Sequence, residues 1–149
     1  FDMKRFFPCC FVLIFSFLLA SCATVPVASV QQNAGALEFR AEPGKAMIYI
    51  YRQRGPVGGS ETYAVYLDGR LLGNNGLGTF LIATVSPGPH VISAGLSQTL
   101  VTTTPGGIYF VRQTGYVGTS PTNNTTVRLV SSEEGKQGVR ECKQTASNL

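Results

Sequence analysis

Apolar residues are distributed in two different patterns along this 149-residue chain. From Cys9 to Leu19 every position except Ser16 is apolar, and this run is shorter than the roughly 20 residues of a membrane-spanning helix. From Ala46 onward, apolar and β-branched residues come in short runs that Gly, Pro and Asn separate. The second pattern is typical of strands joined by tight turns.

The body of the chain predicts about seven or eight short strands and no long helix. The expected strands are 46–52, 62–67, 70–73, 79–85, 90–94, 98–104, 108–112 and 125–130. Because strands this short and closely spaced are typical of all-β folds, we expect a single antiparallel β-sandwich. The charged segment 133–145 predicts a short exposed helix, although Gly135 and Gly138 disfavour it.

Three turns separate these strands most clearly. Asp68 and Gly69 predict a hairpin, because Gly accepts positive φ and Asp bonds back to its own backbone. Asn74-Asn75-Gly76 predicts a second turn. Pro87 and Gly88 predict a third, and His90 follows it at the start of a strand. His90 is the only histidine, and it can be interpreted as a general base or metal ligand. We favour a structural role, in which a ring N–H bonds to the turn backbone.

The first apolar run has the features of a secretory signal. Lys4 and Arg5 precede it, and small residues follow it. The four residues Leu19, Ala20, Ser21 and Cys22 resemble the lipobox of bacterial lipoproteins. That resemblance implies cleavage before Cys22, a diacylglycerol on its sulfur and an acyl chain on its amine. Two or more chains on one residue anchor a protein far more firmly than one chain does. The alternative is an ordinary Cys after a standard signal.

The resulting organisation has four parts. We expect a removed signal over residues 1–21, and a lipidated Cys with a flexible tether over 22–44. The β-sandwich domain should cover 45–145 and a tail 146–149. In the lipoprotein family, a residue such as Ala23 in place of Asp is typical of the outer membrane. We therefore expect the domain to face the periplasm from that membrane.

The turn motifs also resemble a known type of domain. The segment Val65–Gly69 followed by Gly73 is similar to the Asp-Gly hairpin of PEGA-type β-sandwich domains, and 85–92 is similar to the Pro-Gly-x-His turn that follows there. Residues 44–52 and 105–112 resemble bacterial lipoproteins that carry a domain of unknown function. The resemblance implies an extracytoplasmic sandwich without established catalytic activity. The polar insert 118–126 departs from that pattern.

Composition leaves little material for catalysis. Charged residues make up only 13% of the chain, and the net charge is +4. No Gly-x-Ser-x-Gly motif and no metal-ligand spacing occurs, so we expect no cofactor and no metal. Cys142 is the one thiol outside the signal and the lipobox, either free or paired with another chain. The Lys and Arg residues form no dense patch in the sequence, which disfavours nucleic-acid binding.

These observations favour a lipid-anchored protein of the bacterial cell envelope that binds or scaffolds without catalysis. Its expected partners are the membrane, through the covalent lipid, and an envelope protein or glycan. One alternative is a peptidoglycan or polysaccharide binding module, which needs several Tyr and Arg side chains clustered on one exposed face. The other is an envelope hydrolase that uses His90 with Asp68 or a Glu.

Overall fold

The computed structural model describes residues 30–55, 61–116 and 124–149. Two helices and nine strands follow one another in this part of the chain. In order they are α1 (Val30–Ala36), β1 (Ala46–Arg52), β2 (Tyr63–Leu67), β3 (Arg70–Asn75), β4 (Thr79–Val85), β5 (Gly88–Ala94), β6 (Ser97–Thr103), β7 (Ile108–Gly115), β8 (Thr125–Val130), α2 (Ser132–Arg140) and β9 (Lys143–Gln144).

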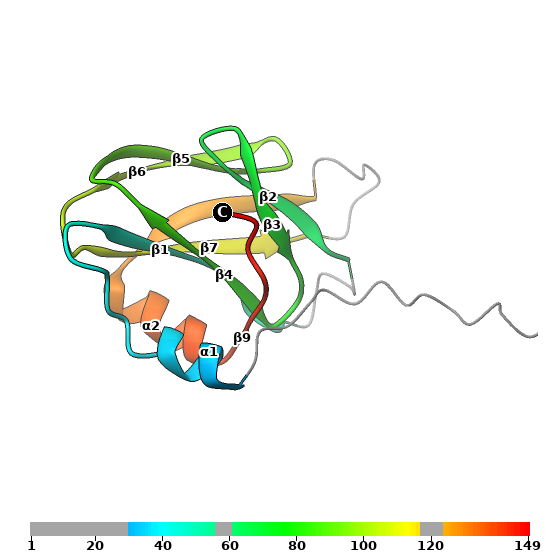
Figure 1. Ribbon diagram of the computed structural model, residues 1–149. Helices are drawn as coiled ribbons and strands as arrows, with labels where there is room; N and C mark the ends of the chain where they lie inside the picture. The colour runs from blue at the N-terminus through cyan, green and yellow to red at the C-terminus, as the bar shows by residue number, and fades with distance from the viewer. Residues whose placement is uncertain (1–29, 56–60, 117–123) are drawn as a thin grey trace, which may run out of the picture.

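The strands form two facing sheets, and both helices lie against the outer side of the larger one (Figure 1). The larger sheet has five strands in the order β8-β7-β1-β4-β9, and the smaller has four in the order β3-β2-β5-β6. This arrangement confirms the all-β sandwich. The larger sheet is mixed, however, because β1 runs parallel to β7 and β4 runs parallel to β9. The chain passes through the smaller sheet between β1 and β7, which makes a parallel return possible.

Strand β1 is buried on both faces, which explains its uninterrupted apolar sequence. Ile48 and Ile50 belong to the core between the sheets, whereas Tyr49 and Tyr51 belong to a second core beneath the helices. Because the side chains of β1 point alternately into two cores that exclude water, neither face of the strand needs polar residues. All four side chains have no solvent exposure.

The turn predicted at Asn74-Asn75-Gly76 is wrong, because both asparagines belong to β3. Asn75 is fully buried, and its amide nitrogen donates to the Gln113 side chain on β7 at 2.9 Å. Gln113 in turn donates to the Thr125 hydroxyl at 3.1 Å. A buried amide satisfied across the core stabilises the strand conformation over the turn. The chain instead turns at residues 76–78, where Gly78 has a φ of +72°.

Helix α2 packs on the larger sheet through its glycines, not as an exposed helix. Gly135 lies over the Phe110 ring and Gly138 over the Tyr51 ring. Both glycines are buried, as is Val139 on the same face. Ser131 caps the helix by accepting from the Glu134 amide at 3.2 Å. The helix-disfavouring glycines therefore allow close approach to the sheet, which outweighs their low propensity.

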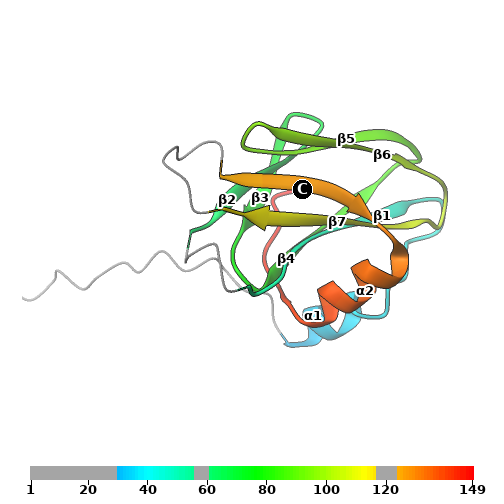
Figure 2. The same ribbon diagram turned by 180° about the vertical axis from the view of Figure 1, so that it is seen from behind.

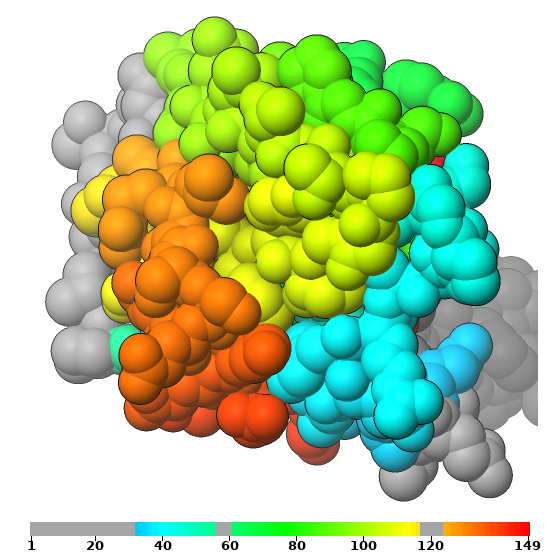
Figure 3. All heavy atoms as spheres, turned by 90° about the vertical axis from the view of Figure 1, so that its left-hand side faces the viewer, coloured from blue at the N-terminus to red at the C-terminus, as the bar shows by residue number. Residues whose placement is uncertain are grey.

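Residues 30–44, the described part of the expected tether, include helix α1 and pack partly against the larger sheet. The Tyr49 hydroxyl donates to the Ala36 carbonyl at 2.7 Å. Phe39 contacts Tyr49 and Phe110 edge-on, with ring centroids 5.3 and 5.6 Å apart. The guanidinium of Arg140 on α2 lies 5.4 Å from the centre of the Phe39 ring. Figure 3 shows the cyan segment after α1 lying against the red-orange α2, which closes this core from the side.

Replacing Gly138 by Ala should destabilise the fold, although Ala is the better helix former. The added Cβ overlaps the Tyr51 ring, and overpacking of this kind costs about 1–3 kcal/mol. Gly35→Ala in α1 is the matched control, because nothing lies within 4 Å of its Cβ position. That control should lower the free energy of unfolding by no more than about 0.5 kcal/mol, or should raise it. Urea unfolding measures both, and a Gly138→Ala protein at least as stable as Gly35→Ala contradicts this packing.

Candidate functional site

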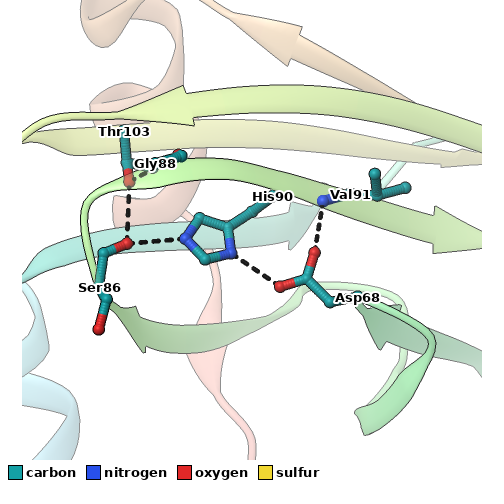
Figure 4. A network of polar contacts seen from close by, with 6 residues as sticks. All are labelled: Asp68, Ser86, Gly88, His90, Val91 and Thr103. Carbon is teal, nitrogen blue, oxygen red and sulfur yellow. Dashed lines mark hydrogen bonds and ion pairs between the residues drawn. The ribbon is translucent and has the colours of Figure 1, made fainter.

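His90 and Asp68, predicted separately as turn residues, meet in one network (Figure 4). The His90 Nδ1 lies 2.7 Å from Asp68 Oδ2, and its Nε2 lies 2.7 Å from the Ser86 carbonyl oxygen. Asp68 Oδ1 accepts the Val91 amide at 2.8 Å. The network connects the β2–β3 hairpin, the turn before β5 and β5 itself.

Hydrogen bonding favours the charged form of both groups. Burial alone would raise the pKa of the Asp68 carboxyl, but the bonds from His90 and Val91 and the His90 charge lower it overall. Burial alone would lower the pKa of His90, but its bonds to Asp68 and Ser86 and the Asp68 charge raise it overall. Both ring nitrogens face acceptors, so the doubly protonated imidazolium satisfies both contacts.

This geometry is that of a structural clip. A general base needs an unshared ring nitrogen that reaches substrate, and both His90 nitrogens are already bonded to the protein. The backbone agrees with the predicted turns: Asp68 and Gly69 have φ values of 49° and 79°, and Gly88 has 136°. Pro87 stands at the bend before β5.

Possible metal ligands are scattered over the described part of the chain, and its one cysteine is buried. No group of three or more His, Cys, Asp or Glu side chains there is placed to hold a metal ion. Cys142 is buried, and its thiol donates to the Arg52 carbonyl at 3.5 Å. Burial raises the pKa of Cys142 to about 12, helped by the Glu141 charge. A buried protonated thiol is poorly placed to pair with another chain.

A second cluster lies on the helix-bearing side of the larger sheet, beside the first turn of α2. Arg112 and Arg128 face each other across β7 and β8, and Thr114 faces Thr126 one pair further along. Tyr116 follows β7, and its hydroxyl lies 3.0 Å from that of Thr126. We call these five residues the polar shelf. Two clefts of about 550 and 410 Å³ adjoin it, sharing Arg112, Thr114 and Tyr116 as lining residues.

Glu134, from the first turn of α2, is the counterion of the polar shelf. Its Oε1 lies 3.4 Å from Arg112 Nη1 and 3.3 Å from Arg128 Nη2. Figure 2 shows α2 below β7 and β8, the strands that carry these two arginines. One carboxylate oxygen thus serves two guanidinium groups. Arg54 lines the larger cleft and adds a further cation.

Arg52 closes the open end of the sandwich interior next to the larger cleft. Its side chain is 2% exposed, donates to the Glu61 carbonyl and lies 4.8 Å from the centre of the Tyr63 ring. Burial lowers its pKa, although the Tyr63 and Glu61 charges act in the opposite direction. A Cβ at position 115 would lie 2.7 Å from Arg52 Nη2, which explains Gly115. We interpret Arg52 as structural.

Sequence reasoning missed the polar shelf. It concluded that the basic residues form no patch, whereas β7 and β8 bring Arg112 and Arg128 into register. The alternation of Arg128 with Val127 and Leu129 was the available signal, because it places the arginine on one face of its strand. The facing position on β7 becomes known only with the register.

The predicted lipid site lies outside the described residues, as do Leu19, Ala20 and Ser21 before Cys22. Residues 118–123 of the polar insert also lie outside them, while Thr125 and Thr126 begin β8. Of the helices in the described ranges, none has the length and apolar character that membrane crossing requires.

Comparisons with known proteins place the chain among others of unknown function. Residues 42–126 match the family described as "Protein of unknown function (DUF2846)". A protein of Haemophilus influenzae, described as uncharacterized, is 30% identical over 151 residues, covering 98% of this chain and 89% of that protein. No solved structure matches. The matched range includes Asp68, His90 and Arg112 and ends before Arg128 and Glu134.

The His90–Asp68 clip predicts a pH-dependent stability. The contribution of Asp68 is complete above its ordinary pKa of 3.8 and disappears as pH falls through its lowered folded value. That of His90 is complete below its ordinary pKa of 6.5 and disappears as pH rises through its raised folded value. Asp68→Asn, which keeps a residue that accepts positive φ, should cost about 1 kcal/mol near pH 5.5 and less near pH 9.

Urea unfolding of both proteins at several pH values measures this difference. An NMR titration of the His90 ring gives an independent check, because the clip requires a folded pKa above 6.5. A His90 pKa at or below that value would contradict the clip, whatever the unfolding data show.

Proposed function

Because this chain belongs to the DUF2846 family of proteins of unknown function, we propose its role from its own residues: a lipid-anchored protein of the bacterial cell envelope whose sandwich binds a polysaccharide at the polar shelf, without catalysis. Its likeness to PEGA-type domains in the Asp68-Gly69 hairpin and the Pro87-Gly88 turn is part of this proposal.

One observation supports binding at the polar shelf above all. The sheet surface there is uncovered by α2 and presents hydroxyl, guanidinium and phenol groups side by side. Tyr116 is 47% exposed, so its ring is available to an apolar sugar face. Thr114, Thr126 and the two arginines supply donors and acceptors for sugar hydroxyl groups. The polar shelf thus combines one tyrosine with two arginines on one exposed face, where the expected polysaccharide-binding arrangement has several tyrosines.

The anchor rests on the sequence. Lys4, Arg5, the short apolar run and Leu19–Cys22 together support export and lipid attachment at Cys22. The relative that aligns along 98% of the chain comes from Haemophilus influenzae, a bacterium, and lipobox processing is bacterial chemistry. The absence of Asp at position 23 favours the outer membrane over the inner one.

The geometry gives less support to the alternatives. A hydrolase using His90 would need a ring nitrogen directed at substrate, and both nitrogens are bonded within the protein. A purely scaffolding protein would make its protein contacts through the exposed apolar residues of the four-stranded sheet, which are Tyr66, Leu71, Val91 and Leu100. Such a role would leave the polar shelf without a ligand.

The Cys22→Ala protein should take up no labelled palmitate and should remain as an uncleaved or soluble precursor. The reason is that the thiol carries the diacylglycerol. Ser21→Ala keeps a small residue before the cysteine and should be labelled like the wild type. Palmitate incorporation into Cys22→Ala would refute the lipid site.

Tyr116→Ala should lower binding to purified peptidoglycan sacculi by about fivefold or more, as expected when a central aromatic contact worth about 1 kcal/mol is removed. Tyr66→Ala is the matched control, because Tyr66 is 38% exposed on the other sheet. Co-sedimentation of the purified domain with sacculi measures both. The proposal fails if the wild-type domain stays in solution, or if Tyr66→Ala and not Tyr116→Ala loses binding.

A further inference from the structure

We propose that the polar shelf recognises a carboxylate group of an acidic saccharide, which enters between Arg112 and Arg128 and displaces Glu134. This inference rests on the proposed function and names its ligand chemistry. Glu134 then competes with the ligand carboxylate for the same two guanidinium groups. The charges of these three side chains and the distances between them support this exchange.

The two arginines carry more charge than Glu134 neutralises. Both ion pairs use the same oxygen, Oε1, at 3.4 Å from Arg112 and 3.3 Å from Arg128. Charge-assisted N–H···O bonds usually measure about 2.7–2.9 Å, so neither guanidinium has a close partner in Glu134. With two cations and one anion, the cluster retains a net positive charge that a second carboxylate would neutralise.

The exposure of the three side chains shows that a ligand can reach these ion pairs. The side chains of Arg112, Arg128 and Glu134 are 41%, 64% and 38% exposed. Exposed ion pairs contribute at most about 1 kcal/mol, so a ligand carboxylate can replace this one at little cost. A planar carboxylate also fits the fork of a guanidinium with two parallel bonds, which the single oxygen of Glu134 does not provide.

Tyr51, on the strand next to Arg112 and beneath Gly138 of α2, adds a buried polar group near these charges. Its side chain is fully buried, and its hydroxyl finds no hydrogen-bond partner within the described residues. The pKa of Tyr51 is raised to about 12, first by burial and then by Glu134, while Arg112 and Arg128 act to lower it. The orphaned hydroxyl therefore lies within the field of these three charges. Buried polar groups without a partner are rare in native structures, and a bound water or ion is one kind of partner that completes them.

The two basic residues of α2 do not contribute to the polar shelf. Lys136 and Arg140 lie over the Phe39 ring, with their charges 5.9 and 5.4 Å from its centre. The attraction for an anion at the shelf therefore depends on Arg112 and Arg128, with Arg54 lining the adjoining cleft. Neutralising Glu134 should strengthen that attraction.

The test uses the purified sandwich domain and two soluble probes. One is a tetrasaccharide of alternating glucuronate and N-acetylglucosamine, and the other is the neutral tetrasaccharide of N-acetylglucosamine. We expect the acidic probe to bind the wild type at least tenfold more tightly. Glu134→Gln should strengthen its binding about three- to fivefold, because an internal competitor is removed. Arg112→Gln should weaken it about tenfold or more.

Two matched variants control for charge and stability. Glu133→Gln removes the same charge from the same turn of α2, but neither shelf arginine pairs with Glu133. Arg70→Gln removes an exposed arginine from the β2–β3 hairpin on the other sheet. Both should leave affinity for the acidic probe within about twofold of the wild type. Thermal unfolding confirms that each variant is folded before its affinity is compared.

The outcomes separate this inference from the proposed function. If both probes bind equally and Glu134→Gln changes nothing, the carboxylate inference is refuted while polysaccharide binding stands. If Glu133→Gln strengthens binding as much as Glu134→Gln, the effect is general electrostatics and the displacement is refuted. If neither probe binds and sacculi are not bound either, the proposed function fails together with the inference.

Discussion

The close approach of α2 to the larger sheet is the contact on which most of this structure depends. Gly135 and Gly138 have no side chains, so the helix backbone lies directly on Phe110 and Tyr51. This contact closes the second core and gives β1 a dry environment on both faces. The same contact fixes where the first turn of α2 begins, and therefore places Glu134 beside Arg112 and Arg128. The candidate site is a consequence of helix packing.

The two sides of the sandwich consequently have different characters. On the helix side, aromatic rings are stacked beneath α1 and α2, and the sheet beyond α2 is polar and uncovered. On the other side, the His90–Asp68 clip joins the β2–β3 hairpin to β5 and stiffens the four-stranded sheet. Ionisable groups are few in this chain, and the ion pairs His90–Asp68, Arg112–Glu134 and Arg128–Glu134 lie in these two places. The His90–Asp68 contacts join parts of the smaller sheet, and the Arg112 and Arg128 contacts with Glu134 lie on a partly exposed surface.

Local sequence patterns predicted most strands because their signals are short-range. The bounds of β1 and β4 agree with the expected 46–52 and 79–85, since apolar runs and flanking turns define both. The incorrect predictions concern segments whose conformation depends on contacts between residues far apart in the sequence. Asn75 continues β3 because it bonds across the core to Gln113. Residues 30–44 pack partly against the larger sheet because Phe39 and Ala36 meet aromatic rings far along the chain. The polar shelf depends on strand register, which no local pattern contains.

The central claim is that the polar shelf, and not the other sheet, is the binding surface. NMR mapping tests it most directly: the ¹⁵N-labelled domain is titrated with soluble fragments released from peptidoglycan, and amide shifts are followed residue by residue. The account predicts the largest changes along 112–116, 126–128 and the first turn of α2. Changes concentrated on the exposed residues of β5 and β6, around Val91 and Leu100, would contradict it.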